Sequence, residues 1–390
     1  MKKLLFVILS LGCGGAERSL INLLTVLPKD RYDISLLLFR REGAFLSQLP
    51  AHVRLLDTPE DLRRLYGPMG RSGRYAGTKL LGTLAGRLMD GKATDGKMMY
   101  RWTHFYKKAL RALPGEYDVA ISYLEGESAY YVADFVSARR KIAWIHSDYS
   151  KLGLRADDER AVLGKMDALV TVSAKCSDAL KEKLPELSGR VHMLENITSS
   201  EVVRRLAGES VPPEFRQGCF RILSVGRLIE VKGFDMAIDA AAELVQRGLK
   251  IQWLVLGEGP ERAALEARLE QRGLTGTFQL PGLRINPYIY MKQADLLVQS
   301  SRYEGKSIVV DEAKMMGLPA LLTRYSTAAD QIDDGRNGWI VDMNAHAIAE
   351  GIARLAAHPD ELAAVRAELL SHDYSNISEL EKYQRLFDEE

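Results

Sequence analysis

Hydrophobic and polar positions follow two alternating periods along this 390-residue chain. Short apolar runs, typical of buried strands, are separated by stretches whose apolar residues recur every three or four positions, as in helices. This alternation is typical of doubly wound parallel α/β sheets. The first half predicts strands at residues 3–9, 33–39, 53–56, 119–123, 141–145, 168–172 and 191–194. The second half predicts strands at residues 220–225, 252–256, 277–280, 295–299, 320–322 and 338–341, with helices such as 235–247 and 260–272.

The length of the chain and the pattern in both halves predict two Rossmann-like domains, because one compact core rarely grows to this size. Residues 196–217, which include Pro212 and Pro213, are the predicted linker. Two such domains facing each other would place a cleft between the carboxyl ends of their strands, where ligands bind in parallel sheets.

Composition places the chain among soluble globular proteins, with 46% hydrophobic and 27% charged residues. The net charge is +1, but residues 1–200 hold 31 Lys and Arg against 23 Asp and Glu, whereas the remaining residues hold 22 against 29. A basic first half indicates an anionic surface or acceptor. The near-neutral total and the lack of a recognised motif argue against nucleic acid. The three cysteines are widely spaced, which fits a reducing cytoplasm.

The N-terminus has some features of a signal peptide, since Met1, Lys2 and Lys3 precede an apolar run over residues 4–11. That run is short, and residues 10–12 fit a cleavage site poorly, so we expect a buried first strand. The longest apolar runs stay below 18 residues, and we therefore expect no transmembrane helix. The cytoplasmic location that we expect rests on the cysteines.

Residues 62–113 form a basic segment with twelve Lys and Arg against two acids, Asp90 and Asp95. Apolar and aromatic residues, among them Trp102 and Tyr106, are interleaved with the cations. Such a segment suits the anionic face of a membrane, and it equally suits a solvated helical surface. Both interpretations stay open at this point.

The stretch 300–319 carries two carboxylates, Glu304 and Glu312, between a predicted strand and a helix over residues 308–316. We expect the backbone N–H groups of Lys306, Ser307 and Ile308 to be unpaired at the positive end of that helix. Carboxylates that accept sugar hydroxyls, beside donors suited to phosphate, indicate a nucleotide-sugar pocket. The alternative is a pair of ordinary surface glutamates.

Two further turns follow predicted strands. Gly14 and Gly15 would let the backbone approach a ligand closely, although they do not form the dinucleotide fingerprint. Gly226 and Arg227 follow the first strand of the second half, and Lys232 precedes the next helix. Both cations are expected at the cleft rim, where they would neutralise a diphosphate.

Together these motifs resemble the retaining GT-B glycosyltransferases of family 4. The matching patterns are G-G-A-E at 14–17, G-R-L-x-x-x-K-G-F at 226–234, V-L-G-E-G-P at 255–260, L-P-G-L at 280–283, S-x-x-E-G at 301–305 and D-E-A-x-x-x-G-x-P at 311–319. The resemblance implies an acceptor-binding domain over residues 1–198, joined by a returning helical segment at 374–390. It also implies a donor-binding domain over residues 199–373, facing the first across a cleft.

The resemblance further implies roles for individual residues. Catalytic roles would fall to Arg227 and Lys232 at the diphosphate, Glu304 at the transferred sugar and His146 near that sugar. Donor contacts would come from Gly14, Gly15, Gly226, Leu280, Gly282, Gly305, Lys306, Ser307 and, on the ribose hydroxyls, Glu312. Two positions depart from the family pattern, Lys306 and Asp311, and both leave the donor sugar open.

The implied activity is transfer, with retention, of a hexose or N-acetylhexosamine from a nucleotide diphosphate sugar, most simply a UDP-sugar. The acceptor would be a glycan or lipid-linked glycan in cell-surface polysaccharide synthesis, at the inner face of the membrane. Neither a metal nor a cofactor is expected. A nucleotide-sugar 2-epimerase of the same fold and a catalytically silent partner subunit are the alternatives.

Overall fold

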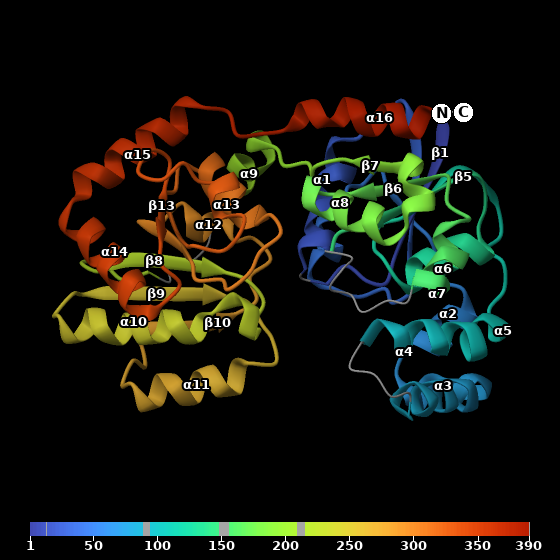
Figure 1. The fold of residues 1–390 in the computed structure, drawn as a ribbon, viewed down its shortest axis with the longest axis horizontal. Coiled ribbons are helices and arrows are strands. Elements are labelled where there is room, and N and C mark those ends of the chain that lie inside the picture. The colour runs from blue at the N-terminus through green and yellow to red at the C-terminus, as the bar shows by residue number, and fades with distance from the viewer. Residues whose placement is uncertain (13, 89–93, 148–155, 209–214, 390) are drawn as a thin grey trace. The chain divides into compact units, whose positions relative to one another are not determined.

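The chain divides into two compact units in the computed structural model, which describes residues 1–12, 14–88, 94–147, 156–208 and 215–389. The first unit comprises Met1–Ile197 and Ser378–Glu390, and the second comprises Thr198–Ile377. Figure 1 shows the elements of both units, and each unit is described here by itself.

The first unit is built on a seven-stranded sheet in the order β3-β2-β1-β4-β5-β6-β7, with every neighbouring pair parallel. The predicted doubly wound sheet is therefore confirmed for this half. The strands are β1 (Lys2–Ile8), β2 (Tyr32–Leu38), β3 (Arg54–Leu55), β4 (Glu116–Ser122), β5 (Ser137–Ile145), β6 (Ala168–Thr171) and β7 (Val191–Met193).

Helices cover both faces of this sheet, because alternate residues of each strand supply two separate cores. In β1, Leu5 and Val7 enter one core, whereas Leu4, Phe6 and Ile8 enter the other. The helices of the unit are α1 (Gly15–Val26), α2 (Glu60–Tyr66), α3 (Ala76–Leu88), α4 (Thr94–Arg101), α5 (Lys107–Ala109), α6 (Glu127–Phe135), α7 (Ala156–Leu163), α8 (Ala174–Lys183) and α16 (Leu380–Asp388).

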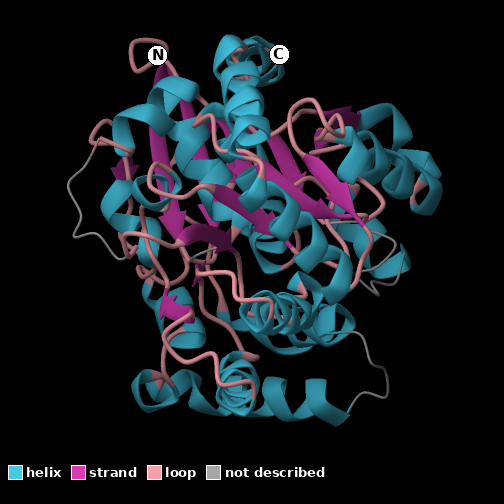
Figure 2. Ribbon diagram, turned by 90° about the vertical axis from the view of Figure 1, so that its left-hand side faces the viewer, coloured by secondary structure: helices cyan, strands magenta, loops and turns pink. Residues whose placement is uncertain are grey.

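The C-terminal helix α16 packs on the first unit. Tyr383, Leu386 and Phe387 are at most 3% exposed and lie in the same core as Phe6. The ring of Phe387 meets that of Phe6 edge-on, with centroids 6.1 Å apart. Figure 2 shows the strands with helices on either side of them.

The basic segment 62–113 is largely a helical layer whose aromatic residues point inward. Trp102 and Tyr106 are only 1% and 2% exposed and belong to a core of the first unit. They are thus not available to a membrane surface, because they fill the space between this layer and the sheet. Among the described residues of the segment, the large apolar side chains that reach the surface are Met69 and, on α3, Leu80, Leu81 and Leu84.

The second unit repeats the architecture with a six-stranded parallel sheet in the order β10-β9-β8-β11-β12-β13. Here too the predicted sheet is confirmed. The strands are β8 (Phe220–Val225), β9 (Ile251–Leu256), β10 (Phe278–Gly282), β11 (Leu296–Gln299), β12 (Ala320–Thr323) and β13 (Trp339–Val341).

Two cores again flank the sheet, with Trp253 and Val255 of β9 on one side and Leu254 and Leu256 on the other. The helices are α9 (Ser200–Leu206), α10 (Phe234–Gln246), α11 (Arg262–Gln271), α12 (Tyr288–Met291), α13 (Ile308–Met315), α14 (Ala345–Ala357) and α15 (Pro359–Ser371).

The chain passes from the first unit to the second between Ile197 and Thr198, at the start of the predicted linker 196–217, but the rest of the described part of this stretch belongs to the second unit. Helix α9 lies within it, and Val203, Ala207 and Phe215 are buried in a core of the second unit. An apolar face on a short helix therefore makes most of this stretch part of the domain. Pro212 and Pro213 lie outside the described residues.

Among the described residues, every helix is too short or too polar to traverse a lipid bilayer.

Candidate functional site

An ion pair between Lys232 and Glu304 lies at the carboxyl edge of the second sheet. Lys232 Nζ is 2.5 Å from Glu304 Oε1, and the two side chains are 19% and 12% exposed. The same carboxylate oxygen accepts hydrogen bonds from Gln299 Nε2 and Ser301 Oγ, each at 2.6 Å. Three donors on one oxygen fix the carboxylate in place at the end of β11.

Two hydrogen bonds join the loop after β8 to the loop after β11 next to the residues of this ion pair. The hydroxyl of Ser300 donates to the carbonyl of Lys232 at 2.9 Å, and the N–H of Arg302 donates to that of Val231 at 2.7 Å. Gly233 has a positive φ of 63°, and a Cβ there would lie 2.1 Å from the Ser300 carbonyl oxygen. Only glycine permits this close approach, so the residue is required by packing.

A chain of glycines links the ends of β8, β9 and β10. The N–H of Gly257 donates to the carbonyl of Gly282 at 3.1 Å. A Cβ on Gly257 would lie 1.9 Å from the carbonyl oxygen of Gly226. Gly226 in turn lies against the side chain of Lys232, whose Cδ would be 3.4 Å from a Cβ at position 226. Gly226 and Gly282, both predicted donor contacts, are therefore brought together with Lys232 at one edge.

Glu312 lies inside the unit on α13 and is only 3% exposed. Its Oε1 accepts a hydrogen bond from the hydroxyl of Tyr288, at 2.6 Å, on α12. Helix α12 follows the segment of Leu280 and Gly282 in the chain, so Glu312 is held by the element that comes after the region predicted to frame the base. The surface-glutamate alternative is wrong for this residue because its carboxylate is buried.

The N-terminus of α13 differs from the prediction at Ser307. Its N–H donates to Gln331 Oε1 at 2.9 Å, and Gln331 Nε2 donates back to the Ser307 carbonyl at the same distance. The expected unpaired amide at this position is thus occupied by a buried glutamine side chain. Lys306 is exposed and faces Asp311 at 3.9 Å, whereas a Cβ at Gly305 would meet open space.

Arg227 is exposed immediately after Gly226, and among the described residues no side-chain hydrogen bond or ion pair holds its guanidinium. Leu280 is half-buried, and its carbonyl accepts a hydrogen bond from Arg262 Nη1 at 3.2 Å. The carboxyl edge of the second sheet thus carries two cations. Lys232 is held by its ion pair with Glu304, whereas Arg227 has no such partner among the described residues.

The remaining predicted residues belong to the first unit and follow its strands. Gly14 caps α1 with extended backbone, and the helix begins at Gly15. The carboxylate of Glu17 lies over Gly14, where a Cβ would come 2.4 Å from Glu17 Oε2. Cys13, between this turn and β1, lies outside the described residues.

His146 directly follows β5, and its ring lies beside Tyr123, with ring centroids 5.1 Å apart. Its backbone N–H donates to Glu125 Oε2 at 3.0 Å. The ring nitrogen Nε2 is buried and has no hydrogen-bond partner among the described residues. Burial lowers the pKa of His146, although Glu125 and a hydrogen bond to the Tyr123 backbone act in the opposite direction. The imidazole is therefore neutral near pH 7, with a nitrogen available to a ligand.

The sequence analysis did not identify several polar residues around the Lys232–Glu304 pair and around His146. Gln299 and Ser301 lie at the end of β11, and Glu125 follows β4. They could have been predicted, because ligands bind at the carboxyl ends of parallel strands. Tyr288 and Gln331 come from distant loops and carried no local signal. Tyr325 is buried, and its hydroxyl has no hydrogen-bond partner within the described part of the chain. Burial and the Glu304 carboxylate raise the pKa of Tyr325.

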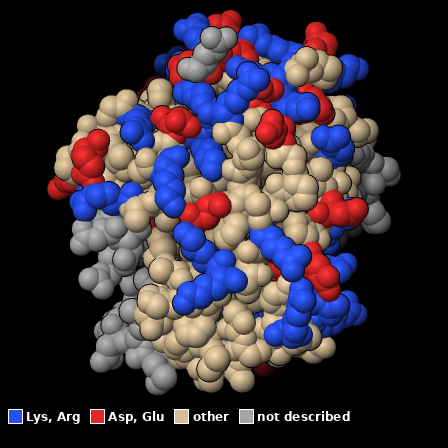
Figure 3. Space-filling model, turned by 90° about the vertical axis from the view of Figure 1, so that its right-hand side faces the viewer, with Lys and Arg blue, Asp and Glu red and all other residues tan. Residues whose placement is uncertain are grey.

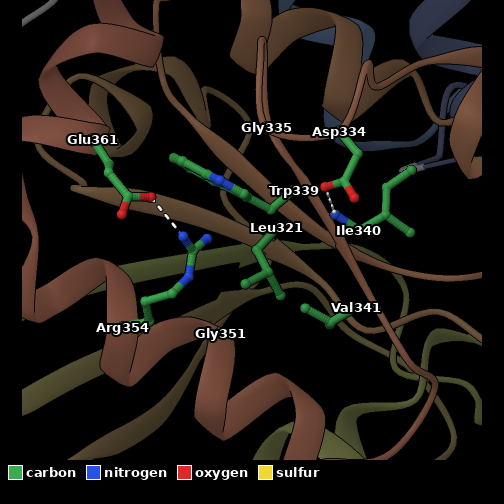
Figure 4. Close-up of a pocket in the computed structure, with 9 residues that line it drawn as sticks. All are labelled: Leu321, Asp334, Gly335, Trp339, Ile340, Val341, Gly351, Arg354 and Glu361. Atoms are coloured by element: carbon green, nitrogen blue, oxygen red, sulfur yellow. Dashed lines mark hydrogen bonds and ion pairs between the residues drawn. The ribbon is translucent and has the colours of Figure 1, made fainter.

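A cavity of about 480 Å³ elsewhere in the second unit contains none of the predicted residues. Figure 4 shows it beside β13, where Arg354 points toward Glu361 and the Asp334 carboxylate toward the backbone of Ile340. The Arg354–Glu361 distance is 2.7 Å, and the N–H of Ile340 donates to Asp334 Oδ1 at 2.9 Å. Its charged groups are thus satisfied within the protein.

A cluster of Glu243, His346 and Glu350 has the ligand types of a cation site among the described residues. Arg247 pairs with both carboxylates of the cluster and already neutralises them.

Residues 210–368 match the family described as Glycosyl transferases group 1. Alpha-D-kanosaminyltransferase of Streptomyces kanamyceticus is 28% identical over 52% of this chain and 54% of its own. The lipopolysaccharide core biosynthesis glycosyltransferase LpsE of Rhizobium meliloti (strain 1021) is 34% identical over 34% of this chain and 37% of its own. The chain thus matches about half of the first relative's length and less of the second.

Two solved structures extend the likeness to both units. Anabaena HepE in complex with UDP-glucose has a TM-score of 0.70 at 16% identity and covers 99% of each chain. A S. aureus TarM variant in complex with Fondaparinux, alpha-GlcNAc-glycerol and UDP has a TM-score of 0.67 at 14% identity and covers 100% of each chain. Both units of this chain therefore have the GT-B fold, and its residues 210–368 match the Glycosyl transferases group 1 family.

Proposed function

We propose that this protein is a glycosyltransferase that moves a hexose or N-acetylhexosamine from a UDP-sugar to a glycan or lipid-linked glycan. The observation that carries the proposal is the Lys232–Glu304 pair at the carboxyl ends of β8 and β11. This is the edge of a parallel sheet where ligands bind, and it lies within the residues that match the family. The UDP of the HepE and TarM complexes supports the choice of nucleotide.

The proposed reaction needs little besides orientation and charge stabilisation. The bond between the sugar C1 and the diphosphate oxygen breaks, and the acceptor oxygen bonds C1 on the same face. The acceptor proton passes to the departing phosphate oxygen, so no separate base is required. Lys232 and Arg227 would stabilise the charge that grows on the diphosphate. Retention and metal independence are parts of this proposal.

The remaining site residues take positions around that reaction. The carboxylate of Glu304 contacts Lys232 through Oε1. Its second oxygen, Oε2, would accept hydrogen bonds from hydroxyl groups of the sugar. Glu312 would bind the ribose, with Tyr288 holding its other oxygen. From the first unit, the unpartnered Nε2 of His146 would accept a hydrogen bond from the sugar, and the turn at Gly14 and Gly15 would approach the diphosphate.

A binding screen tests the donor class directly. Thermal shifts are recorded with UDP-, GDP- and dTDP-linked hexoses and N-acetylhexosamines, and the proposal expects the largest shift from a UDP-sugar. Incubation with that donor alone separates the transferase from the alternatives. An epimerase would change the sugar without releasing UDP, and a silent subunit would bind the donor and leave it intact.

We also propose that α3 attaches the protein to the inner face of an anionic membrane. Leu80, Leu81 and Leu84 form one stripe of the helix and are 50%, 57% and 45% exposed. The opposite face packs inward at Gly82, where a Cβ would lie 3.0 Å from Arg101 Cγ. Figure 3 shows Lys and Arg side chains over much of the lower half of this side of the molecule.

Vesicle co-sedimentation tests the membrane proposal. The protein is expected to sediment with phosphatidylglycerol vesicles at low salt and to be released at high salt, because the attraction is partly electrostatic. The variant Leu80→Ser/Leu84→Ser should remain in the supernatant. Equal binding to phosphatidylcholine vesicles, or equal binding of the variant, contradicts the proposal.

A further inference from the structure

A cavity of about 830 Å³ in the first unit is lined by four arginines, Arg40, Arg41, Arg63 and Arg71. We name it the arginine cavity. It lies at the carboxyl ends of β2 and β3, because Arg40 and Arg41 follow β2 and Asp57 on its wall follows β3. Parallel sheets bind ligands at this edge.

The positive charge of the arginine cavity is only partly neutralised by the protein. Arg40 faces Glu42 at 3.3 Å, and Arg41 faces Asp57 at 2.6 Å. Arg63 and Arg71 are exposed and form no ion pair among the described residues. The cavity therefore holds two more cations than anions among its lining residues.

A fifth cation lies behind the wall of the cavity. Lys79 donates a hydrogen bond to the carbonyl of Gly67, a lining residue. Burial lowers the pKa of Lys79, and so do the nearby charges of Arg101 and Arg40. Cations that repel one another in this way are stabilised by a bound anion.

The wall of the cavity is held in place by local contacts. Arg64 Nη1 donates to the Arg71 carbonyl at 2.6 Å, and Thr58 Oγ1 donates to the Leu38 carbonyl at 2.7 Å. The rings of Phe39 and Tyr66 pack together with centroids 4.8 Å apart. The arginines therefore extend from a fixed frame, and arginine binds phosphate oxygens in a bidentate manner.

The loop that carries Arg40 and Arg41 is fastened to the loop after β1. The N–H of Arg40 donates to the Leu9 carbonyl at 2.8 Å, and the N–H of Leu11 donates to the Glu42 carbonyl at 3.0 Å. A Cβ on Gly43 would lie 1.9 Å from the Leu11 carbonyl oxygen, so only glycine allows this contact. The cavity thus adjoins the segment that leads to Gly14 and α1.

We propose that the arginine cavity binds the phosphate or diphosphate group of the acceptor, an inference that rests on the proposed function. The neighbouring loop after β1 would approach the donor, so an acceptor held here by its anionic group would have its sugar end close to the reaction. A phospholipid headgroup offers the same chemistry, and the experiment separates the two sources.

Calorimetric titration with inorganic pyrophosphate tests the cavity without any need for turnover. It is performed in the Lys232→Ala background, which reduces competition from the proposed donor site. Adding Arg63→Gln and Arg71→Gln is expected to weaken pyrophosphate binding at least tenfold, because each lost arginine removes charge-assisted hydrogen bonds. Arg111→Gln, an exposed arginine outside the cavity, should change the affinity less than twofold. Equal affinity in all proteins, or an equal loss with Arg111→Gln, overturns the proposal.

A second arm distinguishes the two sources of phosphate. Farnesyl diphosphate replaces pyrophosphate as a soluble lipid diphosphate, and phosphatidylglycerol vesicles provide headgroups. Loss of farnesyl diphosphate binding in Arg63→Gln/Arg71→Gln, with vesicle binding kept, supports an acceptor site. Loss of vesicle binding with farnesyl diphosphate binding kept overturns it. Circular dichroism checks folding, and single variants replace the double one if it unfolds. Donor binding is measured separately, so failure of the donor site is not confused with failure of the cavity.

Discussion

Lys232 Nζ lies 2.5 Å from Glu304 Oε1, and this contact joins a loop after β8 to a loop after β11, 72 residues later in the chain. In the proposed reaction the lysine would bring the positive charge that a leaving diphosphate needs, and the glutamate would keep that charge in one position. Gln299 and Ser301 donate hydrogen bonds to the same carboxylate oxygen. A group held in advance stabilises developing charge without having to reorganise during the reaction.

The Glu312–Tyr288 hydrogen bond is expected to control affinity for the donor. Glu312→Ala removes a buried carboxylate and should weaken UDP binding by about 10- to 100-fold, as the loss of a charged hydrogen bond predicts. Tyr288→Phe removes only the 2.6 Å bond to Oε1 and should cost a few-fold. Calorimetry with UDP on both variants and on the double variant gives the coupling between them. UDP binding that is unaffected in Glu312→Ala would refute its role on the ribose.

Of two glycines near the ion pair, only one should be sensitive to substitution by alanine. Gly233→Ala should destabilise the protein strongly, because its φ is positive and its Cβ would lie 2.1 Å from a backbone oxygen. Gly305→Ala should leave the melting temperature nearly unchanged, because a Cβ there meets nothing within 4 Å. Thermal unfolding of the two variants measures the difference. Similar melting temperatures for both would contradict the described contact between the loops.

Stability is expected to fall in acid partly because of His146. Burial lowers its pKa in the folded protein, so below the usual value of about 6.5 the unfolded chain binds the proton more readily. Stability from the neutral imidazole is therefore present above that value and is lost as the pH falls below it. The wild-type melting temperature should drop more between pH 7.5 and 5.5 than that of His146→Gln. Parallel curves for the two proteins would show that the histidine is not held neutral.

Turnover is expected to persist in EDTA, since Arg227 and Lys232 would supply the charge that a metal supplies elsewhere. UDP release is compared before and after chelation, with Mg²⁺ and Mn²⁺ added back. Activity that disappears in EDTA and returns with either ion would rule out this part of the mechanism.

The strands of both sheets were predictable because their buried positions come from continuous apolar runs. Leu4–Ile8 and Trp253–Leu256 supply two cores each, and no tertiary contact was needed to recognise them. The stretch with α9 was misassigned because a helix of seven residues is too short to show a recognisable repeat of apolar positions. In the basic segment, the charge count could not show that Trp102 faces inward.

The site was predictable where its residues follow strands directly. Lys232 and Glu304 were expected at one cleft because each lies in a segment that follows a predicted strand. In the structure β8 and β11 are parallel neighbours, and the two side chains are in contact. Gln331 occupies the Ser307 amide, although it lies 24 residues away in sequence with no periodic relation to it. Contacts of this kind depend on the path of loops, which the pattern of apolar residues does not encode.

Release of UDP from UDP-glucose and UDP-N-acetylglucosamine by Lys232→Ala tests the central claim most directly. The exposed Lys292→Ala in the same unit is the matched control. The wild type and Lys292→Ala should release UDP at the same rate from at least one donor, and Lys232→Ala should be slower by about 100-fold, equivalent to ~3 kcal/mol of transition-state stabilisation. Lys232→Ala that turns over its donor as fast as the wild type would contradict the assignment of this edge as the reaction centre.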